Sequence, residues 1–263
     1  MFAKLHFNSN VKIATISDIH LSSRDSRTVP CLFNDIELAT HLQDLSSSND
    51  LVILNGDIFE LLHPKLLPFS YKRELNQIKR TYPKTFFEIK DNKKILFIKG
   101  NHDHAVIIEG KSLYLGVEIV TPYGNLWFEH GHRGINLFQP AEIIDFCIGW
   151  MRRLLGYDTS LLIETFFERN IKGTSFSNGS VNNFIRIARE KFKTNPDIKA
   201  VIYGHLHRPN NLILYEDTPI GQLVICPDYR GFLDTTFIEI DKEGNVLAYT
   251  EEPNKLPIKE IYI

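Results

Sequence analysis

The sequence predicts an α/β fold in one domain. Short apolar runs typical of buried strands alternate with amphipathic segments typical of helices. Polar residues and glycines follow directly after most of these runs, as they do where the strands of an α/β sheet end in loops. The 263 residues are enough for one globular domain with a complete hydrophobic core, so we expect a single domain over 1–263.

Five apolar runs are expected to form the first strands. They are VKIATIS (11–17), LVILN (51–55), KILFIK (94–99), LWFE (126–129) and AVIY (200–203). Amphipathic spacing predicts helices near 31–45 and near 69–82. Toward the end of the chain, the runs LILY, LVIC, TTFIEI and VLAY are separated by turn residues, which predicts an antiparallel C-terminal section.

Composition narrows the functional class. A net charge of −2 offers no broad basic surface for nucleic acid. The three cysteines are isolated, so neither a disulfide framework nor a thiolate metal site is expected. The opening residues MFAKLHFNSN lack the pattern of a signal or transit peptide, and the longest apolar stretch is too short to span a bilayer. We therefore expect a cytoplasmic protein.

One long connection, about 133–180, is expected to be a helical insertion, a candidate lid. Between Ile143 and Phe167 its apolar residues are too many for one face of a helix. Three roles remain open for it. It packs on the domain, forms the contact of a homodimer, or covers a hydrophobic substrate site, where it would also touch a membrane peripherally.

Polar clusters follow each of the first five predicted strands. They are DIH (18–20), GDIFE (56–60), GNHD (100–103), HGH (130–132) and GHLH (204–207). Seven of the ten histidines lie in or next to these clusters. Because loops at the strand ends of open α/β sheets converge, we expect the clusters to form one site.

The donors in these clusters are carboxylates, an amide and imidazoles, without a thiolate. Such donors suit divalent manganese, iron, zinc or nickel. In an extended chain residues i and i+2 point the same way, so Asp18 and His20 can reach one ion together. The donors exceed the needs of a single ion, which predicts two divalent ions that share one carboxylate.

In this order, the five motifs resemble those of the calcineurin-like metallophosphoesterase superfamily, D-x-H, GD-x-x-(D/E), GNH-(D/E), H and GH-x-H. The resemblance implies a two-sheet α/β/β/α sandwich with a dinuclear centre at the sheet edges. It places Asp18, His20 and His207 on one ion, Asn101, His130 and His205 on the other, and Asp57 between them. It also implies that His102 is a catalytic residue outside the ligand set and that Asp103 orients it.

This resemblance implies a dinuclear-metal-dependent phosphohydrolase. A hydroxide held between the two ions, preferably manganese, would attack phosphorus, and His102 would protonate the leaving group. Glu60 is expected to support its turn or a neighbouring histidine rather than to bind metal. The substrate is expected to be a phosphorylated small molecule or a lipid-linked or nucleotide diphosphate.

The segments GDIFEL, YGHLHRP and CPDYRGFLDTTFIEI also resemble the UDP-2,3-diacylglucosamine diphosphatase branch, which cleaves a lipid-linked nucleotide pyrophosphate. His132 and His102 replace the aspartate and arginine that are usual there, so we specify only phosphoester or pyrophosphate hydrolysis. Two alternatives stay open. One is a nuclease or cyclic-nucleotide phosphodiesterase of the same superfamily, and the other is a non-catalytic scaffold with the same fold.

Overall fold

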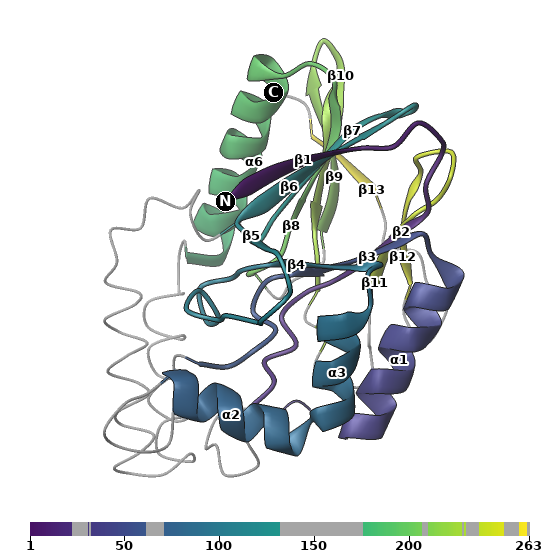
Figure 1. The fold of residues 1–263 in the computed structure, drawn as a ribbon. Coiled ribbons are helices and arrows are strands. Elements are labelled where there is room, and N and C mark those ends of the chain that lie inside the picture. The colour runs from purple at the N-terminus through teal and green to yellow at the C-terminus, as the bar shows by residue number, and fades with distance from the viewer. Residues whose placement is uncertain are drawn as a thin grey trace.

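In the computed structural model, two β-sheets pack face to face and helices cover both outer faces (Figure 1). The structure describes residues 1–22, 31, 33–61, 71–131, 176–206, 210–227, 229, 237–249 and 258–261. The α/β fold and its two-sheet sandwich architecture are confirmed. The expected insertion at about 133–180 lies outside the described residues, except for residues 176–180.

The six-stranded sheet carries three of the five motif-bearing loops. Its strands are β2 (Ile13–Ile16), β3 (Leu51–Asn55), β4 (Ile95–Ile98), β5 (Leu113–Tyr114), β11 (Phe237–Ile240) and β12 (Val246–Tyr249). The order is β12-β11-β2-β3-β4-β5. Neighbours from β2 to β5 are parallel, so the carboxyl ends of β2, β3 and β4 lie at one edge.

The seven-stranded sheet carries the other two motifs. Its strands are β1 (Phe2–His6), β6 (Gly116–Thr121), β7 (Gly124–Glu129), β8 (Ile198–Tyr203), β9 (Asn210–Glu216), β10 (Thr218–Ile225) and β13 (Ile258–Ile261). The order is β1-β6-β7-β8-β10-β9-β13, with β7 and β8 parallel. The loops after β7 and β8 therefore leave the sheet at the same end.

In the part of the chain that the structure describes, four helices cover the sheets. They are α1 (Asp35–Ser48), α2 (Tyr71–Thr81), α3 (Pro83–Asp91) and α6 (Phe176–Thr194). Buried side chains of α1, α2 and α3 pack on the six-stranded sheet, and those of α6 pack on the outer face of the seven-stranded sheet (Figure 1). Within the described residues, no helix is both long enough and apolar enough to cross a membrane.

Strand β3 shows why continuous apolar runs form these layers. Its side chains alternate between two faces, so Val52 and Leu54 join the core beneath the helices. Leu51 and Ile53 face the core between the two sheets. Because both faces are buried, the strand needs apolar residues at successive positions, as is typical of parallel sheets.

The structure refines several expected elements. Helix α1 begins only at Asp35, because Asn34 caps it in a reciprocal capping box with Glu37. The expected 69–82 helix ends at Thr81, and Pro83 begins α3. The C-terminal hairpins β9–β10 and β11–β12 are antiparallel, as expected, yet they belong to different sheets.

Candidate metal centre

The loops after β2, β3, β4, β7 and β8 meet at one edge of the sandwich. Three groups of possible ligands form there, and within each group the ligating atoms all lie within 4.8 Å of one another. The groups are Asp18, His20 and Asp57; Asp57, His130 and His205; and His20, Glu60 and His102. The side chains from both sheets thus converge, as the spacing of the motifs predicts.

Asp57 lies at the centre of this arrangement. Its Oδ2 atom is 2.9 Å from His130 Nε2 and 4.0 Å from His102 Nε2. Its Oδ1 atom accepts a hydrogen bond of 2.8 Å from the backbone N–H of His102. Asp57 belongs to two of the three groups, so one carboxylate faces ligands from both sheets.

His130 is fixed from behind by the backbone. Its Nδ1 atom lies 2.9 Å from the carbonyl oxygen of Asn55, to which it donates. The Nε2 atom therefore faces the site, 3.2 Å from Asn101 Oδ1 as well as close to Asp57. A buried imidazole held in this way presents one defined nitrogen to a metal ion.

The charges of this pair shift both pKa values. Burial favours neutral forms, but Asp57 and Asp18 raise the pKa of His130 to about 9. Burial also opposes ionisation of Asp57, yet the positive charges of His130 and His102 hold the pKa of its carboxyl well below the usual range. In the metal-free protein the two residues therefore form a buried ion pair.

The backbone at the site is strained. Among the described residues, five other than glycine have a positive φ, and four of them are expected ligands. These are Asp18, His20, Asp57 and His205, with φ of 57°, 52°, 53° and 73°. Such conformations cost on the order of 1–3 kcal/mol each and persist where the surroundings impose them. Here they turn four donors toward one point.

Close packing explains two of the motif glycines. A Cβ atom at Gly100 would collide with the carboxylate and backbone nitrogen of Asp57. A Cβ atom at Gly204 would collide with the Ser17 hydroxyl and crowd Asp18. Gly100 lets the loops after the neighbouring strands β3 and β4 approach each other, and Gly204 does the same for the loops after β8 and β2, which belong to different sheets.

Glu60 supports two histidines at once. Its carboxylate lies 3.1 Å from His20 Nδ1, and its two oxygens lie 2.9 and 2.8 Å from His102 Nδ1. These contacts orient the Nε2 atom of each ring away from Glu60. They match the supporting role expected for this residue.

The expected role of Asp103 is corrected. Its carboxylate does not orient His102; it accepts hydrogen bonds from the backbone N–H groups of Gly100 (2.6 Å), Ile58 (2.8 Å) and Phe59 (3.3 Å). Asp103 is fully buried, and its side chain joins the loops after β3 and β4. Burial and the nearby charge of Asp57 raise the pKa of Asp103 to about 7. Glu60 occupies the place beside His102 instead.

The donor set fits divalent cations. Two carboxylates, an amide oxygen and three imidazoles converge here from Asp18, Asp57, Asn101, His20, His130 and His205. These are oxygen and nitrogen donors of the kind that bind manganese, iron or zinc. Two further histidines of the motifs, His132 and the expected ligand His207, lie outside the described residues.

Two residues that position the site carry no sequence signal for this role. The carbonyl oxygen of Asn55 holds His130, and any residue at that position would supply a carbonyl. The Ser17 hydroxyl lies within hydrogen-bond distance of Asp18 Oδ2 and of the same Asn55 oxygen. Serine at a strand end is too common for the sequence to indicate this contact.

Comparison with known proteins agrees with this geometry. The model of the calcineurin-like phosphoesterase family matches residues 11–209, more than half of the chain. The chain belongs to the calcineurin-like phosphoesterase family. It is accordingly a metallophosphoesterase, a hydrolase. No curated protein matches this phosphoesterase in sequence.

Solved structures similar to this phosphoesterase have low sequence identity. A dimetal phosphatase from Danio rerio is 9% identical, with 92% of this chain and 96% of that chain covered and a TM-score of 0.49. Zinc-bound Vps29 from Entamoeba histolytica is 13% identical, with 93% and 96% covered and a TM-score of 0.39. A conserved uncharacterised protein from Streptococcus pneumoniae is 16% identical, with 94% and 93% covered and a TM-score of 0.41.

Proposed function

We propose that this phosphoesterase hydrolyses a phosphoester or pyrophosphate bond at a centre for two divalent ions. The position of Asp57 carries the proposal, because its carboxylate belongs to a ligand group with Asp18 and His20 and to another with His130 and His205. One carboxylate between two such groups is the arrangement that two ions a few Å apart require. Asn101 completes the second group, and His207 is proposed for the first.

Bound divalent ions, for which we propose manganese, would neutralise phosphate oxygens and lower the pKa of a water molecule. The leaving group also needs a proton, and the residue considered for this step is His102. Its Nδ1 atom is held by Glu60, and its Nε2 atom faces the site 4.0 Å from Asp57 Oδ2. We assign His102 to proton donation from Nε2 to the leaving oxygen.

For the substrate we propose a phosphorylated small molecule or a lipid-linked nucleotide diphosphate. The GDIFEL and YGHLHRP segments support the latter through their resemblance to the diacylglucosamine diphosphatase branch. In this proposal the enzyme works in the cytoplasm and touches the membrane through residues 133–180. In the alternative role for the same segment, residues 133–180 would form the contact of a homodimer.

Metal analysis combined with kinetics tests the proposal. Asp57→Asn should abolish both bound metal and hydrolysis of bis(4-nitrophenyl) phosphate. His102→Gln should keep its metal and lower kcat by about 10²–10⁴-fold, the usual range for a lost general acid. His6→Gln, an exposed change on the edge strand β1, serves as the control. An Asp57→Asn protein with full metal content and turnover would contradict the proposal.

Substrate comparison separates the candidates. Purified enzyme with manganese should be assayed on 4-nitrophenyl phosphate, on UDP-2,3-diacylglucosamine, and on cyclic and linear nucleotides. A preference for the lipid-linked pyrophosphate supports the proposed substrate. A preference for cyclic or linear nucleotides would instead favour the phosphodiesterase or nuclease alternative.

A further inference from the structure

Helix α2 carries a concentrated positive charge that the proposed chemistry does not use. Its 11 residues include four basic side chains and one acidic one, in a chain whose net charge is −2. The acidic residue, Glu74, is buried on the inner face of the helix. Lys79 also turns inward, with its Nζ atom 4.6 Å from the centre of the Phe86 ring.

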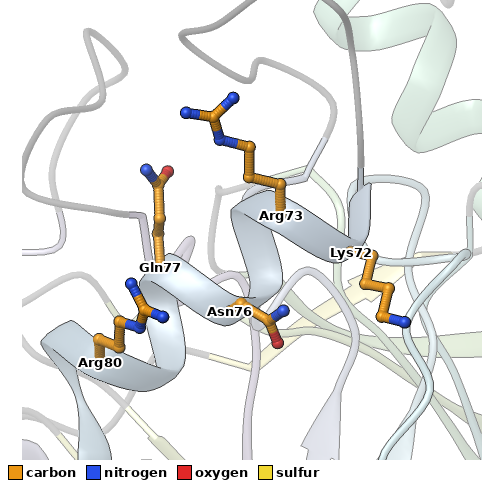
Figure 2. Close-up of a pocket in the computed structure, with 5 residues that line it drawn as sticks. All are labelled: Lys72, Arg73, Asn76, Gln77 and Arg80. Atoms are coloured by element: carbon orange, nitrogen blue, oxygen red, sulfur yellow. The ribbon is translucent and has the colours of Figure 1, made fainter.

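The other three cations line a hollow of about 370 Å³ on the outer face. Its described lining consists of Lys72, Arg73, Asn76, Gln77 and Arg80. At about 100° per residue, these five positions fall on one face of the helix. Figure 2 shows Arg73, Gln77 and Arg80 extending to one side of α2, while Lys72 and Asn76, each next in sequence to one of them, extend to another side. We call this feature the α2 groove.

The chemistry of the α2 groove selects for an anion rich in hydrogen-bond acceptors. Two guanidinium groups, one ammonium group and two carboxamides all offer N–H donors, and the groove has no carboxylate among its described lining residues. In the described part of the chain, no ion pair neutralises Lys72 or Arg80. Guanidinium groups in particular match the geometry of phosphate oxygens.

The start of the α2 groove lies next to the metal centre. Tyr71, the first residue of α2, packs edge-on against the His104 ring with the ring centres 5.6 Å apart. His104 Nδ1 in turn lies 3.0 Å from the carbonyl oxygen of Asn101, an expected ligand. From Lys72 to Arg80 the groove then runs about 12 Å along the helix, at 1.5 Å per residue.

We propose that the α2 groove binds a second phosphate group of the substrate, remote from the bond that is hydrolysed. This inference rests on the proposed function and defines its substrate class as one with a further phosphate beyond the reacting one. Three cations are too few for a duplex, where six to ten phosphate contacts are common, and fewer than the four to eight typical of membrane-binding basic clusters. They suit a small phosphorylated molecule.

A charge-matched pair of double variants tests the α2 groove by direct binding. The double variant Lys72→Gln/Arg80→Gln removes two positive charges from the groove. Glutamine favours helix about as well as lysine and arginine do, so α2 should be retained. Lys90→Gln/Lys93→Gln removes two from exposed positions on and after α3, outside the groove. Inorganic tripolyphosphate should bind EDTA-treated wild type and the α3 variant, and bind the groove variant about tenfold more weakly, from two exposed charged contacts.

Kinetics with paired substrates completes the test. The 4-nitrophenyl ester of thymidine 5′-phosphate and its 3′-phosphorylated form share one reacting bond. The groove variant should raise KM about tenfold for the 3′-phosphorylated form and leave the other form unchanged. Because the binding assay uses metal-free protein, it stands even if the enzyme hydrolyses neither ester. Equal tripolyphosphate binding by both double variants would overturn the inference. It would also be overturned if the wild type failed to bind tripolyphosphate but sedimented with phosphatidylserine vesicles, and the groove variant did not sediment.

Discussion

Glu60 holds the His102 ring in place: its Oε2 atom lies 2.8 Å from His102 Nδ1. Glu60→Gln keeps the size of the side chain and removes the carboxylate charge that stabilises a protonated His102. We expect kcat to fall about 10- to 100-fold at saturating manganese, the range for residues that orient catalytic groups. Steady-state kinetics on bis(4-nitrophenyl) phosphate with metal quantified checks this. Glu109→Gln changes an exposed residue in the loop after β4 and should behave as wild type.

Gly100 permits the close approach of the loop after β4 to Asp57. In Gly100→Ala the new methyl group would displace the Asp57 carboxylate, so we expect loss of bound metal and of activity. Gly110→Ala is the matched control, since a Cβ atom there meets open space. Its φ of 78° still makes alanine cost about 1 kcal/mol of stability. Full metal content in Gly100→Ala would show that the loop tolerates the methyl group.

Metal binding should displace a proton from His130. The pKa of His130 is raised to about 9, so at pH 7.5 the metal-free ring is protonated, while a metal ligand must be neutral. Titration calorimetry in two buffers of different ionisation enthalpy should show release of about one proton from this residue, and metal affinity should rise with pH. Binding heats that are the same in both buffers would contradict the expectation.

The same pair predicts the pH dependence of the metal-free protein. Because the pKa of His130 is raised, its stabilisation is complete below its unfolded value of 6.5 and is lost as the pH rises through about 9. Because the pKa of Asp57 is lowered, its carboxylate stabilises the protein fully above pH 3.8, its unfolded pKa. This stabilisation is lost as the pH falls through the lower pKa of the folded protein. Urea unfolding of EDTA-treated protein should therefore show falling stability between pH 7 and pH 9.5. His130→Asn should reduce this slope.

Asn34 tests the fold separately from the site. Its Oδ1 atom accepts 3.0 Å hydrogen bonds from the backbone N–H groups of Ile36 and Glu37 at the start of α1. Asn34→Ala should lower the free energy of unfolding by about 1 kcal/mol, whereas Asn34→Ser, which can still cap, should lower it less. Denaturant unfolding measures both, and metal content should stay unchanged. A fall in bound metal would indicate that α1 influences the centre.

Much of the fold could be predicted because β2 and β3 are buried at every position and β4, β7 and β8 at most positions, so each contains a run of apolar residues. Strand β1 could not be predicted in this way. It lies at the edge of its sheet, and its alternating exposed and half-buried residues resemble many surface segments. Strand β5 has only two residues, which is too short for any periodic signal.

The candidate site could be predicted to the level of residue types but not of contacts. Asp57 and His130 stand out because charged groups at the ends of buried strands need partners. The family resemblance implied Asp103 as the partner of His102, yet the fold places Glu60 there from the loop after β3. Side-chain direction in a tight loop depends on its backbone angles, and these follow from packing between loops rather than from adjacency.

The ligands for the proposed ions come from both layers of the sandwich, Asp18 and Asp57 from one sheet and His130 and His205 from the other. Metal binding at the centre would thus link the two sheets at one end of the sandwich. Any sliding of one layer over the other would pull half of the coordination sphere away, so the bound cations resist shear. Amide hydrogens of β3 and β8 should then exchange more slowly once the ions are in place.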